Sequence, residues 1–179
     1  FKDLKIVLEH VSSSYGVDFV NANKNIGGTI TPHHMLLTKD DVFKNEKINP
    51  HHYCMPVVKN EEDLLSLRKA ACFDNDKFFL GTDSAPHLTK DKIQHESLKA
   101  GIFSSPCSLE LYANIFEEEH ALHNLEKFSS INGPQFYGLD INSQVLTLNK
   151  TETEVPEYTE EGNIKIKNFF AGQKINWKV

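Results

Sequence analysis

The sequence predicts an α/β fold in which short parallel strands alternate with helices and loops. Four apolar stretches support this prediction, at residues 6–8, 29–30, 51–58 and 78–82. Each stretch is followed by a polar or proline-containing break, and a helix capped by Asn60 is expected after the third. Strands that alternate with such segments are typical of parallel βα winding.

The run FFLGTDSAPH, at residues 78–87, is the most informative stretch of the chain. Its apolar start and its Gly81 and Pro86 are typical of a buried strand that ends in a loop. In parallel sheets and barrels the chemistry lies at the carboxyl ends of the strands, where Asp83 and His87 are expected. A structural interpretation is equally open, in which Asp83 caps the next helix and His87 is a polar loop residue.

The composition is that of a globular protein with an acidic surface. The 179 residues carry a formal net charge of −6, which disfavours nucleic-acid binding because few phosphates could be neutralised. No apolar run approaches the roughly 20 residues that span a bilayer, and the amino end has no signal-peptide pattern. The three cysteines form no CxxC pair, so we expect a reducing, cytoplasmic setting.

The pattern changes after residue 88. A long polar loop is expected over residues 88–105, followed by a helix that begins at Pro106 and continues to residue 128. The sequence Asn132-Gly133-Pro134 is expected to stop it. Alternating residues then predict a small β tail, with strands at residues 143–149, 164–170 and 174–179 and an exposed acidic stretch at 151–162.

Three potential metal ligands each directly follow a predicted strand: His10, His34 and Asp83. Neighbouring parallel strands would bring them to one rim, and two imidazoles with a carboxylate are a ligand set that suits zinc. The alternative is that each histidine is a hydrogen-bonded structural residue, as single histidines usually are. On an extended segment, only one of the adjacent His33 and His34 can face the site.

Five segments together carry a family resemblance. They are LEH ending at His10, ITPHH at 30–34, HHYCMPVVK at 51–59, GTDSAPH at 81–87 and INGPQFYGL at 131–139. In combination they closely resemble dihydroorotase of the compact, single-function bacterial type. The resemblance implies a metal-dependent amidohydrolase on a (β/α)8 TIM-type barrel, which converts N-carbamoyl-L-aspartate reversibly to L-dihydroorotate in pyrimidine biosynthesis.

The resemblance also implies a binuclear zinc site with a carboxylated lysine. His10 and His34 resemble the two histidines that hold the second zinc ion. Asp83 resembles the aspartate that binds the first zinc ion and transfers the proton during catalysis.

Three further residues correspond to substrate contacts of the family. His87 resembles the histidine that helps to bind the substrate carboxylate. Met55 and Ala100 fall where the family holds the substrate through backbone groups. His33 stands where a residue that does not bind metal is expected.

The departures from the family pattern are large. The HxH pair, the metal-bridging lysine, and the substrate arginine and asparagine belong to the first half of the barrel, and the chain contains none of them. We therefore expect residues 1–130 to form about strands five to eight of the barrel, and residues 131–179 to form an extension that packs on it. Such a half-barrel would need the amino-terminal half of the barrel as a partner, and we also expect a homodimer.

Two other functions remain open at this point. One is another cyclic amidohydrolase similar to a hydantoinase, against which the GTDSAPH and NGPQFYGL runs argue. The other is a non-catalytic half-barrel that acts only as an assembly subunit.

Overall fold

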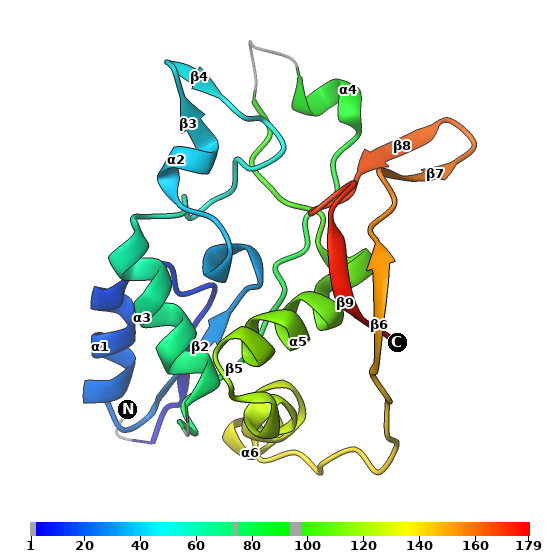
Figure 1. Ribbon diagram of the computed structural model, residues 1–179. Helices are drawn as coiled ribbons and strands as arrows, with labels where there is room; N and C mark the ends of the chain where they lie inside the picture. The colour runs from blue at the N-terminus through cyan, green and yellow to red at the C-terminus, as the bar shows by residue number, and fades with distance from the viewer. Residues whose placement is uncertain (1–2, 74, 94–97) are drawn as a thin grey trace.

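The computed structural model describes residues 3–73, 75–93 and 98–179 (Figure 1). Its centre is a parallel sheet of three strands, β1 (Ile6–Leu8), β2 (Ile26–Ile30) and β5 (Phe78–Leu80), with β2 in the middle. Because all three strands run the same way, their carboxyl ends lie at one edge. The predicted mixed α/β class with parallel strands is confirmed.

The predicted strand at residues 51–58 is wrong. This segment is irregular, and β2 pairs directly with β5, so no strand lies between them. Its apolar character reflects packing instead, because Cys54 and Val58 are buried in the core with 1% and 2% of their surface exposed. Within the described residues the chain thus supplies three parallel strands to the central sheet, rather than the four that we expected.

Two amphipathic helices cover one side of this sheet. They are α1 (Ser14–Ala22) and α3 (Glu61–Cys72), which pack against each other (Figure 1). Asn60 caps α3 as predicted, since its Oδ1 accepts a hydrogen bond from the amide of Asp63 over 3.0 Å. Buried residues from both helices join one core cluster: Val17, Val20, Leu67, Ala70, Ala71 and Cys72.

Short elements occupy residues 39–48 and part of the predicted loop at 88–105. A helix α2 (Lys39–Val42) leads into a hairpin of β3 (Phe43–Lys44) and β4 (Lys47–Ile48). Within the predicted loop at 88–105, residues 89–92 form α4 (Thr89–Lys92), and residues 94–97 lie outside the described part of the chain. A β-bridge from Ser84 to Ile102 closes this loop against the end of β5.

The predicted helix after Pro106 is α5 (Ser108–Glu118), preceded by the 3-10 turn η2 (Ser105–Cys107). It does not continue to residue 128, because His120 has a positive φ of 56° that ends the helix. A 3-10 turn, η3 (Leu122–Asn124), and a short π-helix, η4 (Lys127–Ile131), follow.

The predicted stop at residues 132–134 is also wrong, because these residues begin the helix α6 (Asn132–Tyr137). Pro134 lies in the first turn of that helix, where proline is tolerated. The helix ends instead at Gly138, which adopts the left-handed conformation with φ 71°.

The β tail is confirmed, but its boundaries differ from the prediction. Two antiparallel pairs form it: β6 (Asn149–Glu154) with β9 (Lys174–Lys178), and β7 (Tyr158–Glu161) with β8 (Ile164–Lys167). The predicted exposed stretch at 151–162 contributes to β6 and β7. Its acidic side chains form ion pairs with lysines of the paired strands, which stabilise the pairing, and Oε1 of Glu152 lies 2.7 Å from Nζ of Lys174. Residues 143–148, predicted as strand, form none.

Residues on both sides of position 130 share one core. Leu111 of α5 belongs to one core cluster with Val155, Phe169 and Ile175 of the tail. The Nδ2 of Asn132 donates to the carbonyl oxygen of Phe78 over 2.8 Å, and the ring of Phe136 lies 5.6 Å from that of Phe79. The predicted boundary at residue 130 remains a prediction, and α6 packs directly on β5.

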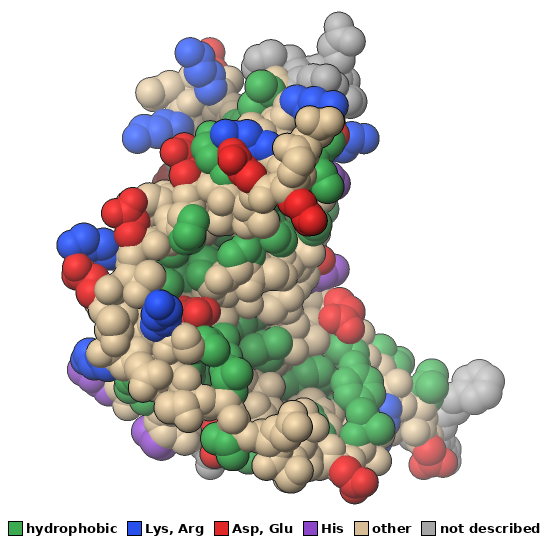
Figure 2. Space-filling model, turned by 90° about the vertical axis from the view of Figure 1, so that its right-hand side faces the viewer, with side chains coloured by type: hydrophobic (Ala, Val, Ile, Leu, Met, Phe, Trp, Pro, Cys, Tyr) green, Lys and Arg blue, Asp and Glu red, His purple; other side chains and the backbone are tan. Residues whose placement is uncertain are grey.

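The surface carries charges of both signs. On the face shown in Figure 2, acidic and basic side chains are scattered among apolar atoms. Within the described part of the chain, no helix has the length and apolar character needed to cross a membrane.

Candidate functional site

The sheet places two of the predicted ligands at one edge, on either side of the middle strand. His10 lies two residues after β1 and Asp83 three residues after β5, and these strands flank β2. Both residues have a φ of +42°, which is uncommon for residues other than glycine. Such backbone strain costs about 1–3 kcal/mol and persists where the surroundings impose it, most often at functional sites.

A threonine of β2 holds the turn that carries His10. The amide of His10 donates to Oγ1 of Thr29 over 2.7 Å, and the amide of Val11 donates to the Thr29 carbonyl oxygen over 2.8 Å. The Thr29 hydroxyl in turn donates to Oε2 of Glu9 over 2.7 Å. Three hydrogen bonds within one turn explain how a strained His10 is maintained.

A serine performs the same task for the turn that carries Asp83. The Ser84 hydroxyl accepts hydrogen bonds from the amides of Ser104 and Ser105, at 3.1 and 2.9 Å. The next amide, of Ala85, donates to the carbonyl oxygen of Ile102 over 2.9 Å. These bonds fix the chain after β5 while Asp83 itself stays exposed to solvent.

His34, the third predicted ligand, lies on the 3-10 turn η1 (His33–Met35) after β2. Its Nε2 lies 2.9 Å from the carbonyl oxygen of Pro56, and its Nδ1 lies 2.7 Å from Oγ1 of Thr31. A carbonyl oxygen can only accept, so Nε2 carries the hydrogen and Nδ1 accepts from the threonine hydroxyl. Burial lowers the pKa of His34 to about 4, which keeps the ring neutral.

Both ring nitrogens of His34 are therefore engaged. A metal ion binds the lone pair of a ring nitrogen, and here that lone pair already accepts the Thr31 hydroxyl. His34 could bind metal only after it gave up one of its two bonds. The prediction that His34 is a metal ligand thus finds no support in this geometry.

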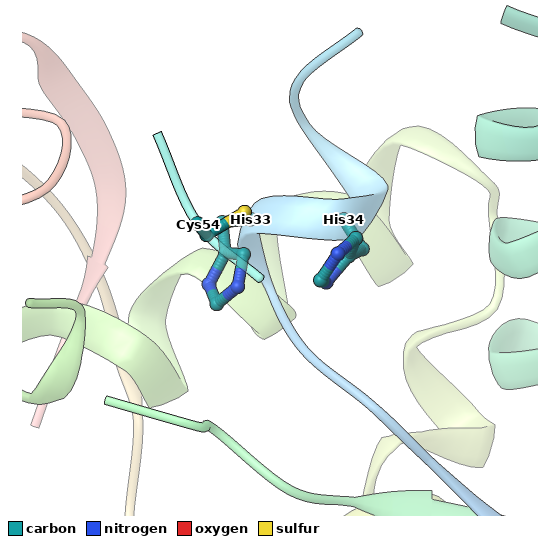
Figure 3. Close-up of side chains that lie close together, drawn as sticks. All are labelled: His33, His34 and Cys54. Atoms are coloured by element: carbon teal, nitrogen blue, oxygen red, sulfur yellow. The ribbon is translucent and has the colours of Figure 1, made fainter. Parts of the chain in front are cut away.

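His33 and His34 do not point to opposite sides, as an extended segment would require. They lie on a 3-10 turn, and their ring centroids are 4.7 Å apart. Figure 3 shows His33 beside Cys54, with His34 further along the same turn. His33, His34 and Cys54 form a buried group that could hold a metal ion, with their ligand atoms within 4.8 Å of one another.

This group is one that the sequence did not reveal, although the HH and HHYC runs contain its members. His33 is fully buried, and neither ring nitrogen has a hydrogen-bond partner among the described residues. Burial lowers the pKa of His33 and raises the pKa of the Cys54 thiol to about 11. The group is thus neutral. The Cys54 thiol donates to the carbonyl oxygen of Pro56 over 3.3 Å, so within the group only the ring nitrogens of His33 lack a partner among the described residues.

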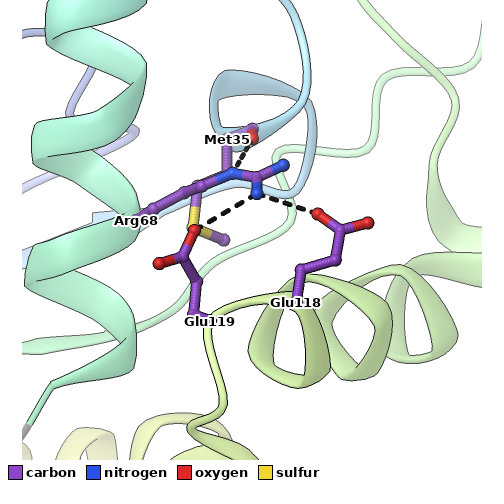
Figure 4. Close-up of polar contacts among 4 residues, drawn as sticks. All are labelled: Met35, Arg68, Glu118 and Glu119. Atoms are coloured by element: carbon purple, nitrogen blue, oxygen red, sulfur yellow. Dashed lines mark hydrogen bonds and ion pairs between the residues drawn. The ribbon is translucent and has the colours of Figure 1, made fainter.

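An arginine of α3 holds η1 in place (Figure 4). The Nε of Arg68 donates to the carbonyl oxygen of Met35 over 2.8 Å. Its Nη1 lies 2.8 Å from the carboxylate of Glu118 and 3.3 Å from that of Glu119, at the end of α5. Arg68 therefore connects three elements around the turn that carries both histidines.

The predicted substrate contacts form a second group. The Nε2 of His87 donates to the carbonyl oxygen of Ala100 over 2.9 Å. The amide of Gly101 donates to the carbonyl oxygen of Tyr53 over 2.9 Å, which joins this loop to the segment that carries Met55. The structure thus brings His87 and Ala100 together and connects their loop to residues 53–55.

Two residues at the edge of the sheet affect the pKa values of the buried group formed by His33, His34 and Cys54. His10 is among the groups that lower the pKa values of His33 and His34. Asp83 is among the groups that raise the pKa of the Cys54 thiol. The structure describes the backbone around the predicted site residues. Their roles remain predictions, and this concerns His10, Asp83, His87, Met55 and Ala100.

No family model matches the chain. A curated dihydroorotase from Erythrobacter litoralis is 48% identical to it over 179 residues, which are 98% of this chain and 51% of that protein. The chain thus spans about half the length of the curated relatives that it matches.

Solved structures agree with this match. Dihydroorotase from Saccharomyces cerevisiae in complex with 5-fluoroorotic acid has a TM-score of 0.88 and 36% identity, covering 99% of this chain and 51% of that one. Dihydroorotase from Campylobacter jejuni has a TM-score of 0.87 and 34% identity, covering 98% and 51%.

Hydantoinases share the fold at lower sequence identity. The D-hydantoinase from Thermus sp. has a TM-score of 0.76 and 16% identity, covering 96% of this chain and 42% of that one. This likeness concerns the fold alone, whereas the dihydroorotases match in both fold and sequence. The chain is therefore homologous, over essentially its whole length, to the carboxyl-terminal half of dihydroorotases.

Proposed function

We propose that this chain forms the carboxyl-terminal half of an active dihydroorotase, which interconverts N-carbamoyl-L-aspartate and L-dihydroorotate. The observation that carries this proposal is the contrast in identity between two families of the same fold. Solved dihydroorotases are 34–36% identical to the chain, and solved hydantoinases are 12–20% identical. The proposal includes the pyrimidine pathway, a cytoplasmic location and a homodimer, all on the basis of this relationship.

The proposal requires the amino-terminal half of the barrel, in the same chain or in another. Within the described residues, β1 and β5 each pair only with β2, so the outer edges of both strands are open. An open edge presents unpaired N–H and C=O groups, which natural proteins usually pair, cover or otherwise protect. The segment after α6 also exposes large apolar side chains, with 65% of Leu139 and 90% of Val145 exposed. We propose that the other half pairs with both edges and closes the barrel.

The metal site of this enzyme would use His10 and Asp83. An imidazole and a carboxylate are ligands that zinc accepts, and both stand on turns fixed by hydrogen bonds at one edge of the sheet. Two ligands cannot fill a binuclear site, so the remaining ligands would come from the amino-terminal half. When bound, zinc would polarise the ring carbonyl and lower the pKa of the attacking water.

Asp83 would act as the general base and acid. In the hydrolytic direction, water attacks the ring carbonyl of dihydroorotate, the carbon–nitrogen bond of the ring breaks, and the nitrogen gains a proton. The Asp83 carboxylate would accept the proton of the attacking water and deliver it to the departing nitrogen. Because Asp83 is exposed on a fixed turn, it can reach a substrate at the mouth of the barrel.

The substrate carboxylate would lie over the second group of residues. His87 would contact it through the ring, and the backbone groups of Met55 and Ala100 would complete the contact. The hydrogen bond from His87 to Ala100 supports this role, because it joins two of the three proposed contacts directly.

The test is the activity of this chain together with an amino-terminal half, as one polypeptide or by coexpression. We expect turnover of dihydroorotate and not of hydantoin or dihydrouracil. Asp83→Ala should abolish turnover and leave the fold unchanged, and the exposed Asp18→Ala on α1 is the matched control. Turnover of dihydroorotate at the normal rate by the Asp83 variant would refute its role. Absence of turnover and of zinc in the folded assembly would favour a non-catalytic subunit.

A further inference from the structure

We propose that Lys92 is a positioning residue, which holds together the two backbone segments that bind the substrate, residues 53–55 and 99–101. This inference rests on the proposed function, because it assigns a role to these segments. Neither the sequence pattern nor the family resemblance drew attention to Lys92.

The ammonium group of Lys92 bonds to three backbone carbonyl oxygens. Its Nζ lies 3.2 Å from the oxygen of Tyr53, 2.8 Å from that of Lys99 and 2.7 Å from that of Gly101. An ammonium has three N–H donors and no acceptor, so the three carbonyls match its full capacity. One side chain on α4 thus connects the segment that leads to Met55 with the residues on both sides of Ala100.

Lys92 is buried, with 4% of its surface exposed. The structure gives it no carboxylate partner among the residues that it describes, and its hydrogen bonds go to the three backbone carbonyl oxygens. Burial lowers the pKa of Lys92 to about 8, and the nearby Cys54 acts in the opposite direction. A buried charge costs free energy unless it is fully hydrogen-bonded, which restricts the positions of all three carbonyls.

Two further contacts make the position of Ala100 specific. The amide of Gly101 also donates to the Tyr53 carbonyl, so this oxygen accepts from both Lys92 and Gly101. Gly101 has a φ of 143°, and an added Cβ would lie 2.7 Å from Cβ of Ala85 and 2.9 Å from Nε2 of His87. Gly101 therefore allows the loop to approach His87 closely, and Lys92 holds it there.

A positioning role predicts a particular kinetic signature. Displaced backbone groups would weaken binding of the substrate carboxylate equally in the ground state and in the transition state, which raises KM and leaves kcat unchanged. Lys92 does not contact the reacting atoms, and Asp83 is held by other bonds through Ser84. A merely structural role would instead lower the amount of folded enzyme, so the apparent kcat would fall at constant KM.

The test compares variants in the assembled protein that carries both halves. We expect Lys92→Met to raise KM at least tenfold with kcat within threefold of the wild type, and Lys90→Met, at an exposed position of the same helix, to change neither. Lys92→Arg, which keeps charge and donors, should recover part of the loss in KM. If Lys92→Met does not fold, Lys92→Gln tests the same loss of charge, because the glutamine amide keeps two N–H donors and is neutral.

The outcomes separate the two proposals. An unchanged KM in a folded Lys92→Met or Lys92→Gln enzyme with wild-type turnover would overturn the positioning role and leave the proposed function intact. A fall in kcat at constant KM would also overturn it. A wild-type assembly that does not turn over dihydroorotate would overturn the proposed function and this role with it.

Discussion

The Nε2 of His87 donates a hydrogen bond to the carbonyl oxygen of Ala100 over 2.9 Å. These residues are thirteen positions apart in the chain, and each was predicted separately to contact the substrate. Since Nε2 is committed to this bond, only Nδ1 of His87 remains to contact a carboxylate. The bond therefore gives His87 two tasks, to contact the substrate and to fix the backbone beside it.

Replacing His87 should remove both tasks at once. We expect His87→Ala to raise KM for dihydroorotate about tenfold or more, since a hydrogen bond to a charged group contributes about 1.5–3 kcal/mol. The measurement is steady-state kinetics of the assembled protein, with the exposed His123→Ala as the control. A KM equal to that of the wild type would show that His87 does not contact the substrate.

The two predicted histidine ligands should behave differently when each is removed. We expect His10→Ala to lower the zinc content of the assembled protein, because we propose that its imidazole is a zinc ligand. His34→Ala should keep the zinc content and lower the free energy of unfolding by about 1–3 kcal/mol, since the carbonyl of Pro56 and the hydroxyl of Thr31 lose their partner. Elemental analysis and urea unfolding measure the two effects. An equal loss of zinc in both variants would restore His34 as a ligand.

The sequence predicted helices and strands best where local signals were strong. Asn60 and the acids that follow it specify the start of α3, and the apolar run before Gly81 specifies β5. The segment at 51–58 has the apolar content of a strand, but its backbone makes no ladder. Composition cannot distinguish a buried irregular segment from a buried strand, because both bury the same side chains.

Only part of the candidate site was predictable, because only some of its features depend on local sequence. Positions after strands are visible in the sequence, so His10 and Asp83 could be named. Whether His34 has a free lone pair depends on Thr31 and Pro56, and the second contact joins residues 22 positions apart. The bonds of Lys92 span up to 39 positions. Long-range contacts of this kind leave no periodic signal, and the sequence could not reveal them.

Arg68 should contribute to stability more than an ordinary surface charge. Its side chain is 16% exposed, and it bonds both to Met35 and to two carboxylates. We expect Arg68→Met to lower the free energy of unfolding by about 1–2 kcal/mol, which exceeds the usual value for an exposed ion pair. Urea unfolding measures the change, and Lys69→Met at the next, exposed position should stay within about 0.5 kcal/mol of the wild type. A change in Arg68→Met no larger than the control would show that the contact contributes nothing.

The three cysteines should be unreactive in the native protein. Cys54, Cys72 and Cys107 are buried free thiols, and burial raises their pKa values to about 11, 12 and 12. The thiolate is the reactive form, so at about pH 8 only ~0.1% or less of each native thiol is ionised. We expect a disulfide reagent such as DTNB to modify no thiol rapidly in the native chain and all three in guanidinium chloride.

The same pKa shifts fix the sign of a change in stability with pH. Above the ordinary thiol pKa of 9.0, the unfolded chain releases protons that the native chain still holds. The contribution of the thiols to the free energy of unfolding is therefore fully present below about pH 9 and decreases from there towards pH 11 to 12. Replacing Cys72 with alanine should reduce this alkaline dependence, measured as the difference in urea unfolding between about pH 8 and pH 10. A variant with the same dependence as the wild type, or rapid modification of a native thiol, would contradict the assignment of these cysteines as buried, protonated core residues.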